Sequence, residues 1–220
     1  MGIADRKRRD REALRQKVLD AARELYAEGG YDALTVRAIA NRIEYSTTVI
    51  YSLFEDKDAL LRALSDADFA VLTERLVAGD RPDAPPAQRI LLLARNFTRF
   101  AVEHPEQYKL IFVNPVPPYS PEEAAAERGN PSQDAYAFAR LAFRSLAETT
   151  PTLVEKDPDV LVQLFWGALH GLISLHVVMG DEPWVEWKPL DQLVSAAMHA
   201  LLRGLGIKES ALETPLAVAA

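Results

Sequence analysis

Cysteine is absent from the sequence, which excludes disulfide frameworks, thiolate metal sites and cysteine nucleophiles. Sustained alternation of apolar and polar residues is absent too, whereas apolar residues at helical spacing recur throughout. The four histidines show neither HExxH nor another paired metal-ligand spacing, and there is no glycine-rich phosphate loop or GxSxG motif. We therefore expect an all-α protein that is not an enzyme and holds no metal or cofactor.

Positive charge is in deficit, since 25 lysines and arginines face 32 aspartates and glutamates, for a net charge of −7. The deficit lies beyond residue 60, because acidic and basic side chains balance within residues 1–60. The first 17 residues carry seven basic groups against three acids. This basic arm is either a solvated tail or a contact for nucleic-acid phosphates or the minor groove. It lacks an apolar run, so we expect no secretory signal and a cytoplasmic protein.

Periodicity and breaker residues divide the chain into helices. The glycines of "EGGYD" end the first helix, and Thr35 is a suitable N-cap for the second, "VRAIANRI". Ser46 and Asp56 are expected to cap the third and fourth. Further helices are predicted at 57–77, 86–103, 105–112, 132–148, 159–179 and 190–205, with an irregular loop at "NPVPPYSPEE".

Residues 161–180, "LVQLFWGALHGLISLHVVMG", carry no charge and are long enough to cross a bilayer. Polar side chains such as Gln163 and Ser174, and acidic flanks without a basic cluster, argue against a membrane span. We interpret the segment as a helix covered within protein, in part by a second subunit. Gly167 and Gly171 would let another helix approach closely.

Residues 45–61, "YSTTVIYSLFEDKDALL", form a short helix with two unlike faces. Ile50, Leu53 and Phe54 share one face, and Thr48, Tyr51 and Ser52 share the other, with Thr47 beside them. A tight turn separates this helix from the preceding one. Two short helices joined in this way predict a helix-turn-helix, whose second helix enters the DNA major groove.

The stretch "VLDAARELYAEGGYDALTVRAIANRIEYSTTVIYSLFEDKDALLRAL" resembles the N-terminal domain of the TetR family of bacterial transcriptional regulators. The resemblance covers about residues 14–64 and includes "AAxxL", "GY", "TVRxIA", "YxxF" and "KxxL" in the family's order and spacing. It implies a repressor that binds an inverted-repeat operator in double-stranded DNA. The DNA-binding residues implied are Thr35, Arg37, Ser46, Thr47, Thr48, Tyr51, Ser52 and Lys57, with Thr47 and Thr48 facing base edges.

Two residues depart from the family pattern. Glu44 stands where glycine is usual in the turn, so a non-glycine residue is forced toward positive φ with its carboxylate near incoming phosphates. Val49 replaces a commoner threonine. Glu44 therefore keeps open the alternative of a helical binding protein that has lost DNA binding.

The resemblance further implies that the DNA-binding part, residues 1–56, precedes an effector-binding and dimerisation part, 57–207, and a loosely held tail, 208–220. "FWGALHGL" resembles the Trp-x-x-x-His-Gly signature of one C-terminal subfamily. The candidates for a homodimer interface are Gly167, Gly171, Leu175, Leu193, Ala197 and Leu201.

A small, largely apolar effector is expected to bind among inward-facing aromatic and histidine side chains. The candidates are Phe97, Phe100, His104, Tyr108, Phe112, Tyr136, Phe143, Phe165, Trp166 and His170. Aromatics at helical spacing also fit a plain hydrophobic core, and His170 fits either a core or a pocket position.

Overall fold

Helices make up the regular structure of the chain. The computed structural model describes residues 2–113, 125–180 and 182–212, and no strand occurs within these ranges. The α-helices are α1 (Ile3–Ala33), α2 (Val36–Ile43), α3 (Thr47–Leu53), α4 (Lys57–Ala78), α5 (Pro86–Glu103), α6 (Pro105–Phe112), α7 (Ala135–Thr149), α8 (Pro158–Met179) and α9 (Leu190–Gly204). Short 3-10 turns cover Pro151–Leu153 and Glu209–Ala211. The expected all-α class is confirmed.

The helices form two compact units. The described residues of Met1–Phe69 and Glu106–Ala125 make the head unit, and those of Ala70–Pro105 and Ala126–Ala220 make the body unit. This division differs from the boundary expected at residue 56, because the first part of α4 and most of α6 belong to the head.

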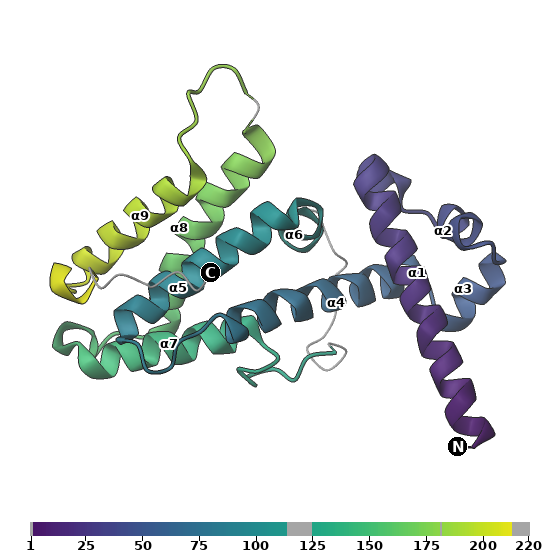
Figure 1. Cartoon of the computed structure of the whole chain (residues 1–220), viewed down its shortest axis with the longest axis horizontal. Coiled ribbons are helices and arrows are strands. Elements are labelled where there is room, and N and C mark those ends of the chain that lie inside the picture. The colour runs from purple at the N-terminus through teal and green to yellow at the C-terminus, as the bar shows by residue number, and fades with distance from the viewer. Residues whose placement is uncertain (1, 114–124, 181, 213–220) are drawn as a thin grey trace. The chain divides into compact units, whose positions relative to one another are not determined.

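The head core is formed where the apolar faces of α2, α3 and α4 meet α1 (Figure 1). On α2 the buried side chains are Ile39, Ala40 and Ile43, as the i, i+3, i+4, i+7 pattern predicts. α3 contributes Ile50, and Phe54 is buried directly after it. With 7 residues α3 is too short to persist alone in water, so it depends on this packing.

Helix capping follows the predictions at two of three positions. The Thr35 hydroxyl accepts a hydrogen bond from the Ala38 amide at 3.1 Å, and the Asp56 carboxylate accepts one from the Ala59 amide at 2.6 Å. Ser46 occupies the N-cap of α3, but its side chain makes no capping hydrogen bond, so the predicted cap is wrong for this hydroxyl.

The pair of glycines near the end of α1 breaks the helix. Gly29 has φ −146° and Gly30 has φ 67° and ψ −161°, a region open essentially to glycine alone. The regular part of α1 therefore ends where "EGGYD" predicts. Residues 31–33 add a last turn, which places Tyr31 against the head core.

A buried carboxylate links three helices of the head. The Asp68 side chain on α4 is fully buried and accepts hydrogen bonds from Arg23 Nε on α1 at 2.8 Å and from Gln107 Nε2 on α6 at 2.9 Å. Leu110 of α6 also lies within the head core. The hydrogen bond from Gln107 and the packing of Leu110 therefore both join α6 to the head.

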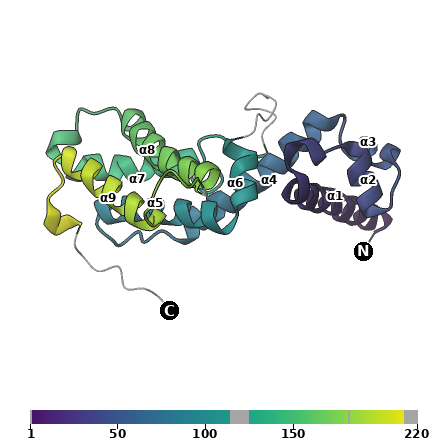
Figure 2. The same ribbon diagram turned by 90° about the horizontal axis from the view of Figure 1, so that it is seen from above.

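The body is a bundle in which α5 packs against α7, α8 and α9, and α8 packs against α7 and α9 (Figures 1 and 2). Phe100, Phe143, Ile173, Met198 and Leu202 are fully buried there. These residues come from all four helices, so one core serves the whole bundle.

Two boundaries in the body differ from expectation. α7 begins at Ala135 rather than near residue 132, because Asp134 caps it by accepting hydrogen bonds from the amides of Tyr136 and Ala137. The first part of the expected loose tail is packed, since Leu212 is buried and Glu209 pairs with Arg203 at 3.2 Å. The rest of that tail, 213–220, and the predicted loop "NPVPPYSPEE" lie outside the described residues.

Candidate nucleic-acid interface

The exposed face of α3 carries hydroxyl groups. Thr47 and Thr48 are exposed and the Tyr51 side chain is 54% accessible, whereas Ile50 on the opposite face is 1% accessible. The predicted separation of the two faces is confirmed. A helix buried on one side and hydroxyl-rich on the other can enter a DNA groove, where hydroxyls bond base edges or phosphates.

The first turn of α2 lies exposed as well. Thr35 and Arg37 are both accessible to solvent, and Arg37 forms no ion pair with any residue that the structure describes. The guanidinium of Arg37 therefore remains available to a phosphate or a base.

The two serines of the predicted set differ in their hydrogen bonds. The Ser46 hydroxyl caps nothing, so it is open to a ligand. The Ser52 hydroxyl instead donates to the Val49 carbonyl within α3 at 2.7 Å. Because a hydroxyl has one hydrogen to donate, Ser52 must give up that bond to contact phosphate as predicted.

Lys57 begins α4 and is half-buried, with its ammonium 4.8 Å from the centroid of the Tyr31 ring. An aromatic face attracts a cation without neutralising it. The contact therefore positions the charge at the start of α4 while leaving it able to meet an anion.

Two cations of α1, which the sequence analysis did not assign, stabilise the ends of α2 and α3. Arg11 donates from its guanidinium to the Ser52 carbonyl at 3.1 Å, and Lys17 donates to the Ile43 carbonyl at 3.3 Å. Both carbonyls lie at helix C-termini, where the partial negative charge of the helix dipole favours cations. The signal in the sequence was the basic arm, but its partners are 41 and 26 residues away.

Arg42 fixes α2 to α1 through two carboxylates. Its guanidinium pairs with Glu24 at 3.0 Å and with Glu28 at 2.5 Å. The hydrogen bond from Arg42 lowers the pKa of Glu28 below its usual value. All three groups are used within the head, so Arg42 belongs to the scaffold of the interface.

Glu44, the residue in the turn between α2 and α3, adopts the left-handed conformation expected for this position, with φ 61° and ψ 42°. It is the only non-glycine residue with positive φ among those described. Its amide donates to the Asn41 carbonyl at 3.2 Å, and the Tyr45 amide donates to the Ala40 carbonyl at 2.9 Å. These bonds close α2 and hold the backbone of Glu44 in a strained conformation that favours glycine.

Residues 18–64 match the family of "Bacterial regulatory proteins, tetR family", and residues 90–201 match the "Tetracyclin repressor-like, C-terminal domain". The second match covers half of the chain. The chain belongs to the TetR family. The family is one of helix-turn-helix transcriptional regulators rather than enzymes.

Curated TetR relatives are named as repressors. The chain is 46% identical over 66 residues to the HTH-type transcriptional repressor Rv1474c of Mycobacterium tuberculosis, a match that covers 30% of this chain and 33% of that protein. It is 28% identical over 141 residues to the repressor KstR of Rhodococcus jostii, covering 63% and 62%. The chain thus spans about a third to three fifths of these relatives.

Solved structures share the fold. A protein of unknown function from Rhodococcus sp. RHA1 superimposes with a TM-score of 0.71 at 22% identity, covering 88% of this chain and 96% of that one. The TetR family regulator PfmR of Thermus thermophilus gives 0.61 at 19% identity, covering 84% and 97%. At these identities the likeness concerns the fold.

The effector candidates of this TetR-family chain are divided between the two units. Tyr108 and Phe112 belong to the head, where the Phe112 ring lies 5.5 Å from that of Phe69. The body contains Phe97, Phe100, His104, Tyr136, Phe143, Phe165, Trp166 and His170. Within it, Phe143 and Phe165 are buried and their rings lie 4.8 Å apart, as in a hydrophobic core.

The candidates nearer the surface of the body carry polar groups. The Tyr136 hydroxyl donates to Asp159 at 2.8 Å, and the centroids of the Tyr136 and Trp166 rings lie 6.4 Å apart. Burial raises the pKa of Tyr136 and lowers the pKa of His170, which favours the neutral form of each. His170 Nε2 lies 3.3 Å from the Ser174 hydroxyl. Tyr136 and His170 therefore carry polar groups that already have partners within the body.

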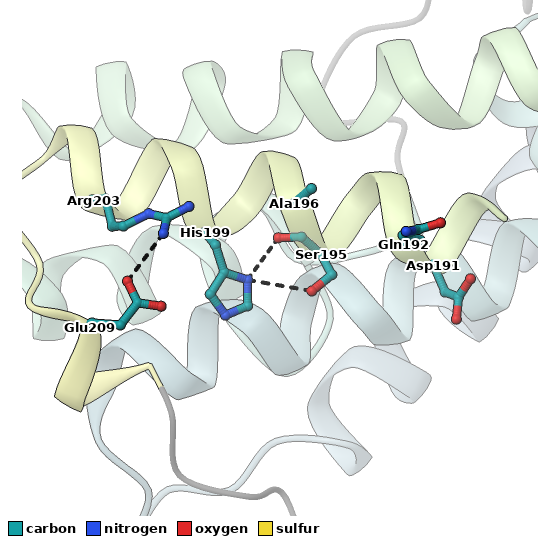
Figure 3. Close-up of a pocket in the computed structure, with 7 residues that line it drawn as sticks. All are labelled: Asp191, Gln192, Ser195, Ala196, His199, Arg203 and Glu209. Atoms are coloured by element: carbon teal, nitrogen blue, oxygen red, sulfur yellow. Dashed lines mark hydrogen bonds and ion pairs between the residues drawn. The ribbon is translucent and has the colours of Figure 1, made fainter. Parts of the chain in front are cut away.

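A shallow depression on α9 is lined by none of the predicted effector residues (Figure 3 shows its lining). It has a volume of about 570 Å³ and is lined by Asp191, Gln192, Ser195, Ala196, His199, Arg203 and Glu209. In Figure 3 His199 turns back to Ser195 of its own helix, and Arg203 pairs with Glu209. Its polar groups thus largely satisfy one another. No cluster of three or more potential metal ligands occurs in the described part of the chain.

The dimer candidates lie on the uncovered sides of α8 and α9. Along α8 the exposed stripe is Val160, Leu164, Gly167, Leu175 and Val178, with Gly171 half-buried within it. An added Cβ at Gly167 or Gly171 would meet no atom within 4 Å. Leu193, Ala197 and Leu201 are half-buried on α9.

We predict that Glu44→Gly raises both the stability of the head and its affinity for DNA. Glycine adopts the left-handed conformation without strain, which should raise the free energy of unfolding by about 1 kcal/mol. It also removes a carboxylate from the turn beside α3. Glu44→Gln is the matched control because it removes the charge and retains the backbone strain. Chemical denaturation and DNA titration should show gains in both for glycine and a gain in affinity alone for glutamine. Equal stability of the glycine variant and the unmodified protein would contradict the strain.

Proposed function

We propose that this TetR-family regulator is a cytoplasmic repressor that binds an inverted-repeat operator as a homodimer and leaves it when a small, largely apolar effector binds. The observation that carries the DNA-binding part is the outward face of α3, with Thr47, Thr48 and Tyr51 exposed opposite a buried apolar face. Relatives named as repressors support repression rather than activation.

The predicted contacts fall into two chemical groups. Thr47 and Thr48 face base edges, which carry the sequence information of the major groove. Thr35, Arg37, Ser46, Tyr51, Ser52 and Lys57 meet phosphates, or a base edge in the case of Arg37, and fix the register. Mutations in the two groups therefore have different signatures.

The first test compares Lys57→Ala with Thr48→Ala on selected operator DNA and on unrelated duplex. Lys57→Ala should weaken binding to both and reduce the slope of log affinity against log salt by about one for each of the two heads of the dimer. Thr48→Ala should reduce discrimination by ~1–3 kcal/mol at particular base pairs. Lys156→Ala and Thr149→Ala, in the body, are matched controls. Loss of folding stability alone in both head variants would refute the assignment.

The uncovered surface of α8 supports the proposed homodimer. Among the described residues, α8 alone has the length and hydropathy of a membrane span, and only 28% of that apolar window is buried within the chain. Exposed apolar patches of this kind mark protein interfaces. The open space above Gly167 and Gly171 suits close approach by a helix of a second copy.

We expect Gly171→Arg to produce a folded monomer that no longer holds the operator. The arginine finds open space in a single chain, but it places bulk and an unpaired charge where a second α8 would pack. Val154→Arg, at another exposed apolar position, is the control and should remain dimeric. Sedimentation equilibrium with DNA titration measures both properties. A dimeric Gly171→Arg protein with unchanged DNA affinity would exclude this interface.

Effector release is argued from the shared helix and the body aromatics. α4 contributes residues to both units, from Lys57 in the head to Ala78 in the body. A ligand among Phe97, Phe143 and Trp166 of the body can act on the head only through its differential affinity for the DNA-bound and free states.

The effector prediction is reciprocal weakening. A ligand found by thermal-shift screening of apolar compounds should weaken operator binding about 5- to 150-fold, which corresponds to ~1–3 kcal/mol of coupling. Operator DNA must weaken ligand binding by the same factor. Calorimetric titration of the ligand with and without operator measures this factor. Weaker ligand binding by Phe143→Ala would place the ligand beside Phe143. Equal ligand affinity in both titrations would remove the effector from the mechanism.

A further inference from the structure

The first turns of α1 extend beyond the head core. α1 begins at Ile3, yet its first fully buried side chain is Val18, and residues 4–13 are all exposed. At about 1.5 Å per residue this exposed segment is roughly 15 Å long. The basic arm of the sequence is thus a helix that continues past the packed part of the head.

The cations of this extension lie on different sides of the helix. With about 100° of rotation per residue, Lys7 and Arg11 lie on one side and Arg9 lies about 160° from Lys7. The side of Lys7 and Arg11 continues the face of α1 that packs in the head core, because Val18, which is buried there, lies within about 20° of both around the helix.

Arg11 connects this side to the recognition helix. Its guanidinium donates to the Ser52 carbonyl at the end of α3 at 3.1 Å, and one turn later the Arg15 guanidinium lies 5.1 Å from the centroid of the Phe54 ring. Lys7, one turn before Arg11, is therefore on the side of α1 that adjoins the end of α3.

Acidic neighbours do not neutralise this side. Asp5 pairs with Arg8 at 3.7 Å, with both side chains largely exposed. Asp10 lies about 60° from Lys7 around the helix and Glu12 about 140° from it, and neither forms an ion pair with a described residue. Lys7 forms no ion pair with any residue in the described ranges, and Arg11 keeps its charge after donating to a neutral carbonyl.

We propose that the extension of α1 is a second DNA-binding element, in which Lys7 and Arg11 bind backbone phosphates beside the groove that α3 enters. The inference rests on the proposed operator binding. Continuity with the face of α3 and charge complementarity support it, because residues 18–60 carry eight acidic against four basic side chains and residues 61–220 are acidic as well. Phosphate contacts of this kind add affinity for any sequence.

The test is a matched pair of single-charge variants, Lys7→Gln and Arg9→Gln, on full-length protein. The probes are an operator duplex selected from random genomic fragments and an unrelated duplex of equal length. Because a homodimer carries two copies of each side chain, Lys7→Gln should lower the salt slope by about 1.8 on both duplexes and weaken binding several-fold, whereas Arg9→Gln should leave the slope unchanged. Lys7→Gln/Arg11→Gln should lower it by about 3.6. Circular dichroism and chemical denaturation confirm that each head is folded.

Each outcome decides the inference. If unmodified protein binds no DNA, the proposed function itself fails. If it binds and both single variants match it, or if both change the slope equally, the extension has no specific phosphate contact and the inference alone is overturned. If Lys7→Gln changes the mass of the assembly but not its DNA affinity, the side of α1 that carries Lys7 and Arg11 contacts a second copy, and the inference is overturned as well.

Discussion

The burial of Ile50 and Phe54 against α1 is the interaction on which the DNA-binding surface depends. α3 has 7 residues, and the nucleation penalty makes so short a helix unstable alone. Burying the apolar side of α3 stabilises the helix and, in the same step, directs Thr48 and Tyr51 outward. Stability and exposure of the recognition residues therefore have one cause.

Charged groups then fix the orientation that apolar packing alone leaves adjustable. Arg42 holds α2 on α1 through two carboxylates, while Arg11 and Lys17 bind carbonyls at the ends of α3 and α2. The buried Asp68 does the same for α4 and α6 within the head. Since each of these contacts joins different helices, the head is a rigid support on which a few exposed side chains can be placed.

The body has a different physical requirement. Its four-helix core buries one face of α8, but most of the apolar window of that helix remains uncovered within a single chain. A stripe that includes Gly167 and Leu175 remains at the surface, which is why a second copy enters the proposed function. Several aromatics expected to line an effector site, such as Phe143 and Phe165, pack against one another as core residues.

Local sequence determined the helices, most of their boundaries, the caps at Thr35 and Asp56 and the two faces of α3, because periodicity and capping involve residues within a turn or two of each other. The resemblance to the TetR family, in which glycine is usual at this turn position, indicated the positive φ of Glu44. Tertiary structure alone decided that Arg11 contacts Ser52 and that α6 packs in the head. Both contacts join residues tens of positions apart, so neither is encoded in a local pattern.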